Sequence, residues 1–168
     1  MLFRSLALAA SLVATQAPSQ AVVADLGLHV LGVAYHRSFN ERVIASVSAD
    51  LYVPWTYTQN TFGLSGASRS DLAGLVVRAR VYFVLWRGLW VSPFLQGGVG
   101  RATGANGVEW GGVAAAGATI GYALVFFEHL LLSGGLGVQV HGAWVGGTSP
   151  PGFLSAWPAV DLLVGYLW

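Results

Sequence analysis

Residues 75–86 read L-V-V-R-A-R-V-Y-F-V-L-W, and the alternation in this stretch decides the fold class. One set of alternate positions is entirely apolar, whereas the other set contains both arginines, Arg78 and Arg80. Residues two positions apart share one face of a β-strand, but on a helix they lie about 200° apart. A helix would turn one arginine towards its apolar side, so the stretch predicts a strand with one apolar and one polar face.

The same period of two continues on both sides of this stretch. Residues 43–53 alternate apolar positions with a face that contains Ser46, Ser48 and Asp50. Further strands are expected at residues 26–36, 89–101, 110–123, 130–141 and 157–168. Short turns are expected at residues 38–40, 87–88 and 127–129, and longer connections at 55–71, 102–109 and 142–156. Alternating short and long connections are typical of a transmembrane antiparallel up-and-down β-barrel.

The number of strands is expected to be even. Seven strands are clear, whereas single-chain bacterial barrels have an even number. Residues 22–36 are too few for two full membrane crossings. We therefore expect an all-β barrel of eight strands, with either a short first strand within residues 22–36 or an extra strand contributed by a loop.

The composition separates this chain from ordinary soluble domains. Hydrophobic residues make up 55% of the sequence and charged residues only 9%, against roughly a quarter in an average soluble domain. Such a chain either meets lipid or hides nearly all of its surface. The net charge of +1 gives no reason to expect a nucleic-acid partner. The absence of cysteine and the scattered positions of the four histidines lead us to expect no metal and no cofactor.

The first 21 residues have the pattern of a secretory signal. Arg4 precedes a short apolar segment at residues 6–14, which is too short to span a bilayer as a helix. Ser19-Gln20-Ala21 fits a small-x-small cleavage site. We expect residues 1–21 to be removed and residues 22–168 to form a single outer-membrane β-barrel domain.

Several stretches resemble known small barrels. Residues 32–55 resemble an opening hairpin, residues 89–100 a middle strand, and residues 160–168 (V-D-L-L-V-G-Y-L-W) a C-terminal assembly signal. Together they resemble the OmpA/OmpX/OmpW-like barrels of Gram-negative outer membranes. The resemblance implies outer-membrane lipid and the barrel-assembly machinery as partners. The implied assembly signal is the outward row formed by Val160, Leu162, Val164, Tyr166 and Trp168.

The polar residues of the strands are expected to meet inside the barrel. The expected lumen network consists of Asp50, Arg78, Arg80 and Asp161. Inward aromatic side chains are expected to crowd the lumen further, which argues against an open pore; they are Tyr52, Tyr82, Trp86, Trp90 and Phe94. Trp110 and Tyr122 lie at the two ends of one strand face and fit the aromatic belts of a membrane barrel.

These features favour a non-enzymatic envelope component or surface-interaction platform. One alternative is a small-solute channel, which would need an open lumen. A second is a lipid-modifying enzyme, with candidate residues His141, Ser133 or Ser155, and Glu109, although their spacing specifies no triad. A third is an α-helical inner-membrane protein, favoured only by the charge-free residues 111–127 with Gly117-x-x-x-Gly121. A soluble lipocalin-like barrel would require charged residues at the outward positions.

Overall fold

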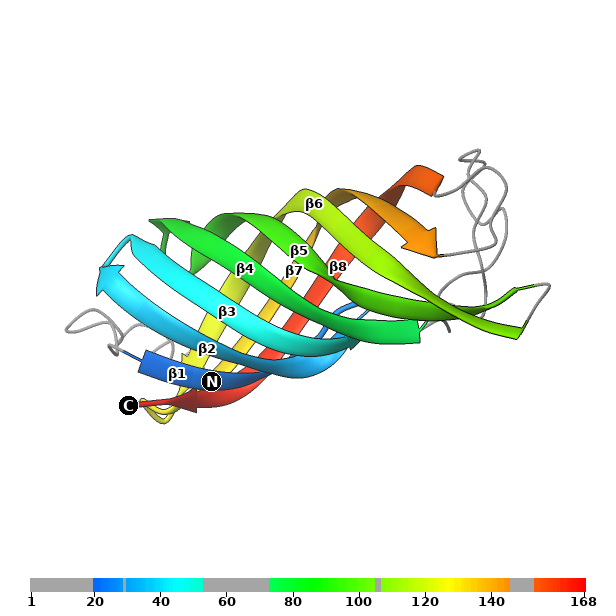
Figure 1. Cartoon of the computed structure of the whole chain (residues 1–168). Helices are drawn as coiled ribbons and strands as arrows, with labels where there is room; N and C mark the ends of the chain where they lie inside the picture. The colour runs from blue at the N-terminus through cyan, green and yellow to red at the C-terminus, as the bar shows by residue number, and fades with distance from the viewer. Residues whose placement is uncertain (1–19, 29, 53–72, 105–106, 146–152) are drawn as a thin grey trace, which may run out of the picture.

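The chain forms a closed antiparallel β-barrel of eight strands (Figure 1). The computed structural model describes residues 20–28, 30–52, 73–104, 107–145 and 153–168. Each strand pairs with its neighbours in the chain, and the first pairs with the last. The strands are β1 (Gln20–Leu26), β2 (Val30–Asn40), β3 (Val43–Tyr52), β4 (Ala73–Trp86), β5 (Leu89–Gly104), β6 (Gly107–Phe126), β7 (Leu130–Val145) and β8 (Phe153–Leu167).

The predicted eight-stranded barrel is therefore confirmed, and the missing strand is β1. The strand expected at residues 26–36 was wrong in its bounds, because Leu26 ends β1 and β2 begins only at Val30. The chain leaves β1 at Gly27, and the backbone N–H of Leu28 donates to the carbonyl of Val160. The helix considered for residues 111–127 was also wrong, because residues up to Phe126 belong to β6.

Three tight turns lie at one end of the barrel, together with residues 20 and 168; we call it the short-turn end. The turn at Arg87-Gly88 is confirmed, with φ values of 41° and 90° that suit a two-residue hairpin. The turn at residues 127–129 is confirmed as well. The turn expected at residues 38–40 was wrong, since β2 continues to Asn40 through an irregularity after Ser38 and the chain reverses at residues 41–42.

The opposite end, which we call the long-loop end, carries the remaining connections. The long connection expected at residues 102–109 was wrong, because β5 and β6 stay paired up to Gly104 and Gly107. This hairpin projects beyond both neighbouring strands (Figure 1), since the pairing of β5 with β4 stops at Arg101 and that of β6 with β7 stops at Gly111. Residues 55–71 and the central part of 142–156 lie outside the described residues.

The ladders that hold the wall together differ in length and continuity. The β5–β6 and β6–β7 ladders each contain 16 residue pairs, whereas the β1–β8 ladder that closes the barrel contains five, from Ala21–Leu167 to Asp25–Leu163. The β4–β5 ladder is interrupted between Arg80–Phe94 and Phe83–Val91. Pro93 lies in this gap, and proline has no backbone N–H to donate to a ladder.

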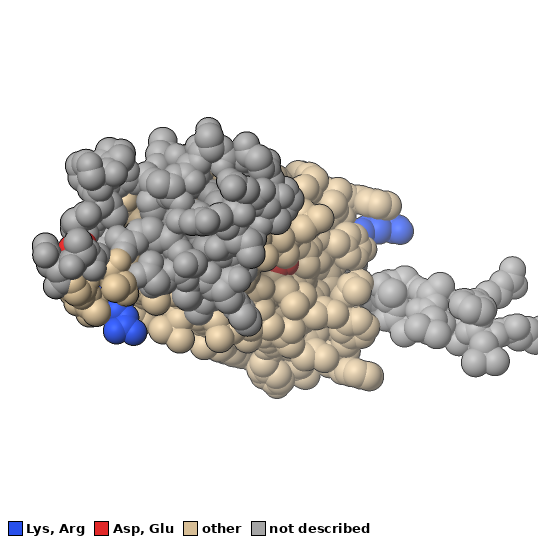
Figure 2. All heavy atoms as spheres, turned by 90° about the vertical axis from the view of Figure 1, so that its right-hand side faces the viewer, with Lys and Arg blue, Asp and Glu red and all other residues tan. Residues whose placement is uncertain are grey.

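The two faces of the strands have the predicted polarity. On β4 the inward Val76, Arg78, Arg80 and Tyr82 are buried, whereas the outward Leu75 and Val77 are exposed. Arg37 lies on the outward face near one end of the barrel, and Arg101 lies on the outward face near the other end. Between these two levels, the described outward positions of the eight strands carry no charged side chain. In Figure 2, which looks at the long-loop end, almost all of the described atoms belong to uncharged residues.

The lumen is filled in layers. An apolar cluster occupies the long-loop end and consists of Val30, Tyr52, Val76, Ala102, Val113 and Ala143. A second apolar cluster occupies the short-turn end and consists of Ala21, Val23, Ala34, Tyr82, Trp90, Leu131, Leu163 and Leu167. Buried polar side chains lie between the two clusters. Among the described residues, no helix is long and apolar enough to cross a membrane.

Large side chains fit in this narrow lumen because glycines lie opposite them. A Cβ atom added at Gly121 or Gly135 would come within 2.4 Å of the Trp90 ring. A Cβ atom at Gly117 would come within 2.7 Å of the Phe94 ring. The expected inward positions of Tyr52, Tyr82, Trp90 and Phe94 are confirmed by their burial. Trp86 was wrongly expected inside: the pairing of β4 with β5 shifts between Val84 and Trp86, and the ring is 64% exposed.

Candidate functional site

The buried polar layer of the lumen is the most concentrated chemistry in the described residues. The structure brings together the four residues that the sequence suggested, namely Asp50 of β3, Arg78 and Arg80 of β4, and Asp161 of β8. It adds Asp25 of β1, which sequence reasoning missed. All five side chains point inward because they occupy the inward positions of their strands, and each is at most 5% exposed. We call this group the charge belt.

Arg80 is enclosed by partners on three sides. Its Nη2 atom forms an ion pair with Oδ2 of Asp25 and lies 3.5 Å from Oδ1 of Asp161. Its Nη1 atom donates to the hydroxyl of Tyr82 at 2.9 Å. These contacts join β1, β4 and β8. Arg80 therefore links the first and last strands through the lumen, in addition to the backbone pairing of these two strands in the wall.

Arg78 forms the second centre of the charge belt. Its Nη1 atom donates to Oδ1 of Asp161 at 3.3 Å and lies 3.7 Å from Oδ2 of Asp25. Its Nε atom donates to Oε1 of Gln96 at 2.9 Å and lies 3.9 Å from Oδ2 of Asp50. The guanidinium group also lies 5.4 Å from the centre of the Phe94 ring, within the range of a cation–π contact.

The carboxylates have neutral partners as well. Ser48 donates to Asp50 at 2.7 Å, and Thr119 donates to Asp161 at 2.9 Å. Three aspartates face two arginines, so the fully ionised belt carries one excess negative charge. Oδ1 of Asp25, Oδ1 of Asp50 and Nε of Arg80 are buried without a hydrogen-bond partner. Such groups are costly to desolvate, so the integrity of the belt depends on each of its members.

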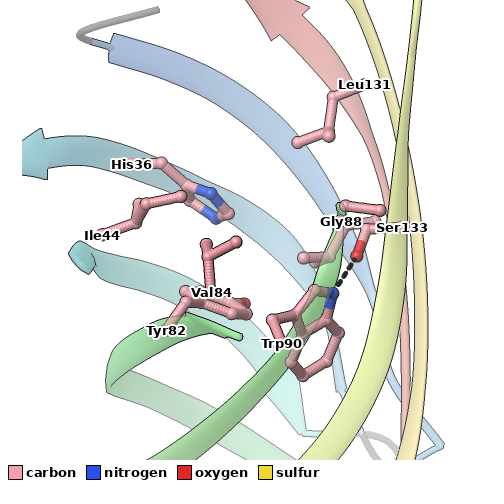
Figure 3. A pocket seen from close by; sticks show the side chains of 10 residues that line it. His36, Ile44, Tyr82, Val84, Gly88, Trp90, Leu131 and Ser133 are labelled. Carbon is pink, nitrogen blue, oxygen red and sulfur yellow. Dashed lines mark hydrogen bonds between the residues drawn. The ribbon is translucent and has the colours of Figure 1, made fainter. Parts of the chain in front are cut away.

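A small cavity lies between the charge belt and the short-turn end (Figure 3). Its volume is about 80 Å³, and its lining is largely apolar. Trp90 lines it and donates through Nε1 to Oγ of Ser133 at 3.0 Å. His36 lines it as well, with its ring centre 5.3 Å from that of Tyr82 and its Nε2 atom buried without a partner. The cavity is partly open, reaches Gly88 in the turn between β4 and β5, and has a few polar groups at its border.

The candidate catalytic residues do not meet in the described structure. Ser133 and His141 lie eight residues apart on β7, which corresponds to about 26 Å along a strand. His141 is paired with Ser155 of β8, whose side chain lies outside the described residues. Ala115 is the residue of β6 that pairs with His141. Glu109 lies six residues from Ala115, which corresponds to about 20 Å along the strand. This geometry gives no support to a triad among them.

The outward candidate residues form rows on the wall. Trp110 and Tyr122 are 64% and 46% exposed towards opposite ends of β6, and their place in two aromatic belts stays a prediction. In the C-terminal row, Leu162, Val164, Tyr166 and Trp168 are exposed and Val160 is half-buried. The ring of Tyr166 stacks between His129 and Trp168, with centre distances of 5.2 Å and 6.3 Å.

Asp25 was missed because β1 itself was missed. The signal was present in residues 20–26, Q-A-V-V-A-D-L, in which Ala21, Val23 and Asp25 share the inward face. Within the described ranges, no group of three or more histidine, aspartate or glutamate side chains is placed to hold a metal ion. No protein-family model matches the chain, and a search of curated proteins finds no significant match.

Proposed function

We propose that the protein is a non-enzymatic β-barrel of the bacterial outer membrane, with a sealed lumen, that serves as an envelope component or surface-interaction platform. The observation that carries this proposal is that polar and apolar side chains are distributed in the reverse of the arrangement in soluble proteins. Charged side chains are buried in the lumen, and every strand presents large apolar side chains to the outside. In water such a continuous apolar wall would be a severe aggregation hazard, whereas in lipid it is the favourable arrangement.

The dimensions of the wall support the same environment. The outward apolar positions of β4 run from Leu75 to Leu85, close to the roughly 9–11 residues that a tilted strand needs to cross a bilayer. A closed barrel also satisfies the hydrogen bonds of its backbone without an open edge, as lipid requires. A soluble lipocalin-like barrel would place charged side chains on this wall, and the described outward positions between Arg37 and Arg101 carry none.

The filling of the lumen favours a platform over a channel. The charge belt spans the barrel between two apolar clusters, and Trp90 and Phe94 fill the space over the glycines of β6 and β7. The projecting β5–β6 hairpin supplies an extended surface at the long-loop end. We place that end outside the cell, because outer-membrane barrels have short periplasmic turns and longer external loops.

Refolding into vesicles tests the proposal directly. The purified chain should insert into phosphatidylcholine vesicles, float with them and give a β-type circular dichroism spectrum. Its band on a gel should shift on heating, as expected for a barrel that resists unfolding. Planar bilayers should show no conductance steps, because the lumen is filled. A chain that folds in buffer and stays out of the vesicles would refute the membrane location, and regular conductance steps would favour the channel.

We further propose that residues 1–21 direct export. Cleavage after Ala21 would remove Gln20 and Ala21 from the observed β1 and leave four of the five β1–β8 pairs. N-terminal sequencing of the protein from the outer-membrane fraction should find Val22. An intact Met1 in the inner-membrane fraction would contradict both export and location.

The C-terminal row is proposed as the signal read by the barrel-assembly machinery. The ring of Trp168 stacks on that of Tyr166, which pairs with Val22 of β1, so Trp168 lies at the closing seam of the chain that begins at Val22. Deleting Trp168 should lower the yield of heat-modifiable barrel in cells well below that of Trp110→Ala, which removes an aromatic residue at the opposite end. Equal yields would remove the special role of Trp168.

A further inference from the structure

Three exposed arginines lie on one side of the short-turn end. Arg42 lies in the turn between β2 and β3, and Arg87 lies in the turn between β4 and β5. These two hairpins are adjacent in the wall, and the N–H of Val84 donates to the carbonyl of Arg42 at 2.8 Å. Arg37 lies on the outward face of β2, close to the same end. We call these three residues the arginine rim.

The guanidinium groups of the rim are available to a ligand. All three residues are exposed, and none of the three forms an ion pair with a described acidic residue. The buried arginines of the charge belt, by contrast, are surrounded by aspartates. Glu41, beside Arg42, is the single acidic residue of these two turns, so this side of the end carries net positive charge.

Aromatic side chains accompany the arginines of the rim. Tyr35 and Phe39 flank Arg37 on the outward face of β2, and both are exposed. The guanidinium group of Arg87 lies 5.4 Å from the centre of the Trp86 ring. Rings of this kind prefer the boundary between hydrocarbon and headgroups. The rim therefore lies where an apolar wall ends and a polar layer should begin.

The other side of the same end is different. The turn between β6 and β7 presents Glu128 and His129, and β8 ends in Tyr166 and Trp168. This side has aromatic residues but no described arginine. Aromatic residues lie on both sides of the short-turn end, whereas the unpaired guanidinium groups lie on one side, which favours an anionic partner on that side.

We propose that the arginine rim binds the phosphate groups of anionic phospholipids in the leaflet that surrounds the short-turn end. This inference rests on the proposed membrane location. Guanidinium groups present a planar fork of donors that matches phosphate oxygens, and basic residues at a membrane surface attract anionic lipids. The acyl chains of the lipid lie against the apolar wall beside Arg37, whose neighbours across β3 and β4 are Ala45 and Val81.

The chain provides a matched control at the opposite end. Arg101 is also exposed on the outward face of a strand, where it pairs with Trp110. It resembles Arg37 in its charge and its aromatic neighbour, but it lies at the long-loop end without a second described arginine beside it. Arg101→Gln therefore removes one outward charge from the wall and leaves the rim intact.

Native mass spectrometry of the folded barrel, titrated with single lipids, measures the binding. Phosphatidylglycerol and phosphatidylcholine of the same acyl chains are the probes, and the affinity ratio of the two lipids is the readout. The wild type should prefer phosphatidylglycerol. Arg37→Gln should weaken phosphatidylglycerol binding about fivefold, and the Arg37→Gln, Arg42→Gln, Arg87→Gln variant by at least about tenfold. Arg101→Gln should leave the ratio unchanged. The affinity for phosphatidylcholine should be the same for every variant.

The outcomes separate this inference from the function it rests on. A chain that fails to insert into phosphatidylcholine vesicles contradicts the membrane location itself. A chain that inserts but binds the two lipids equally overturns the arginine rim as a phosphate site and leaves the barrel proposal standing. An equal loss of phosphatidylglycerol binding in Arg101→Gln and Arg37→Gln would also overturn it, because any outward charge would then have the same effect.

Discussion

The lumen and the outer wall of this barrel are built from alternate residues of the same strands, yet they follow opposite rules. On β4, Arg78 and Arg80 are buried among aspartates, whereas Val77, which directly precedes Arg78 and faces outward, is 57% exposed. In a soluble protein a buried charge and an exposed valine row would both be liabilities. The comparison shows that polar pairing specifies the interior, while the exterior is the apolar wall on which the proposed membrane location rests.

The largest expected effect comes from breaking the polar interior. Arg80→Met keeps the approximate length of the side chain but removes one of the two arginines that Asp25 and Asp161 share, and leaves Arg78 alone to face three aspartates. Removing one member of a buried ion pair costs about 3–5 kcal/mol of unfolding free energy. Urea unfolding of the vesicle-inserted barrel measures this loss, with Arg101→Met as the exposed control. A small effect of Arg80→Met would mean that the charge belt contributes little to holding the barrel together.

A charge on the outer wall should have the next largest effect. Val77→Arg places a guanidinium group in the middle of the apolar band and should cost about 2–4 kcal/mol in a bilayer. Phe39→Arg introduces the same group near the short-turn end, where the cost near an interface is about 0–1 kcal/mol. The comparison is made in vesicles by urea unfolding. Equal and small effects at the two positions would argue that lipid does not cover the wall.

Replacing a glycine by alanine adds one methyl group and compares the packing at the inward and outward faces of β6. In Gly121→Ala the new Cβ would meet the Trp90 ring and a backbone oxygen within 2.4 Å, so we expect a loss of about 1–3 kcal/mol. In Gly112→Ala, also on β6, the Cβ would meet no atom within 4 Å. The unfolding free energy should therefore change little. If both variants unfold alike, the tight packing of Trp90 over Gly121 does not govern stability.

The smallest effect, with the opposite sign, is expected from filling the lumen cavity. Ala123 lines the cavity between Trp90 and Leu131, and Ala123→Val adds apolar atoms there. A gain of about 0.5–1 kcal/mol is expected, as for other cavity-filling changes. Ala118→Val on the outward face of β6 adds the same atoms without entering the lumen. Destabilisation by Ala123→Val relative to this control would show that the cavity cannot accept a larger side chain.

The fold class could be predicted from the sequence because period-two alternation is a local property of each strand. The alternation at residues 43–53 and 75–86 also predicted which side chains face inward, including Asp50, Arg78 and Arg80. Places where the period is broken could not be predicted. The shift in pairing before Trp86 reversed its direction, and an irregularity after Ser38 moved the turn to residues 41–42.

The inward position of Asp25 and its pairing with Arg80 could not be predicted from local sequence patterns. Its strand has only seven residues and is followed by a single glycine, Gly27, rather than by a clear turn signal. Its role depends on Arg80, which is 55 residues away and meets it only when the barrel closes. Local patterns specify strands, but partners across a lumen follow from the register and closure of the whole sheet.

The short β1–β8 ladder has a consequence for the order in which the protein folds. Seven of the eight ladders join strands that are neighbours in the chain, whereas the closing one joins Ala21 to Leu167. Bringing such distant residues together costs about 2 kcal/mol more loop-closure entropy than forming a ten-residue hairpin. In the chain that begins at Val22, only four pairs, from Val22–Tyr166 to Asp25–Leu163, offset this cost. Closure should therefore be the slow, late event in folding. Until it occurs, β1 and β8 expose rows of unpaired N–H and C=O groups to which another chain can add a strand.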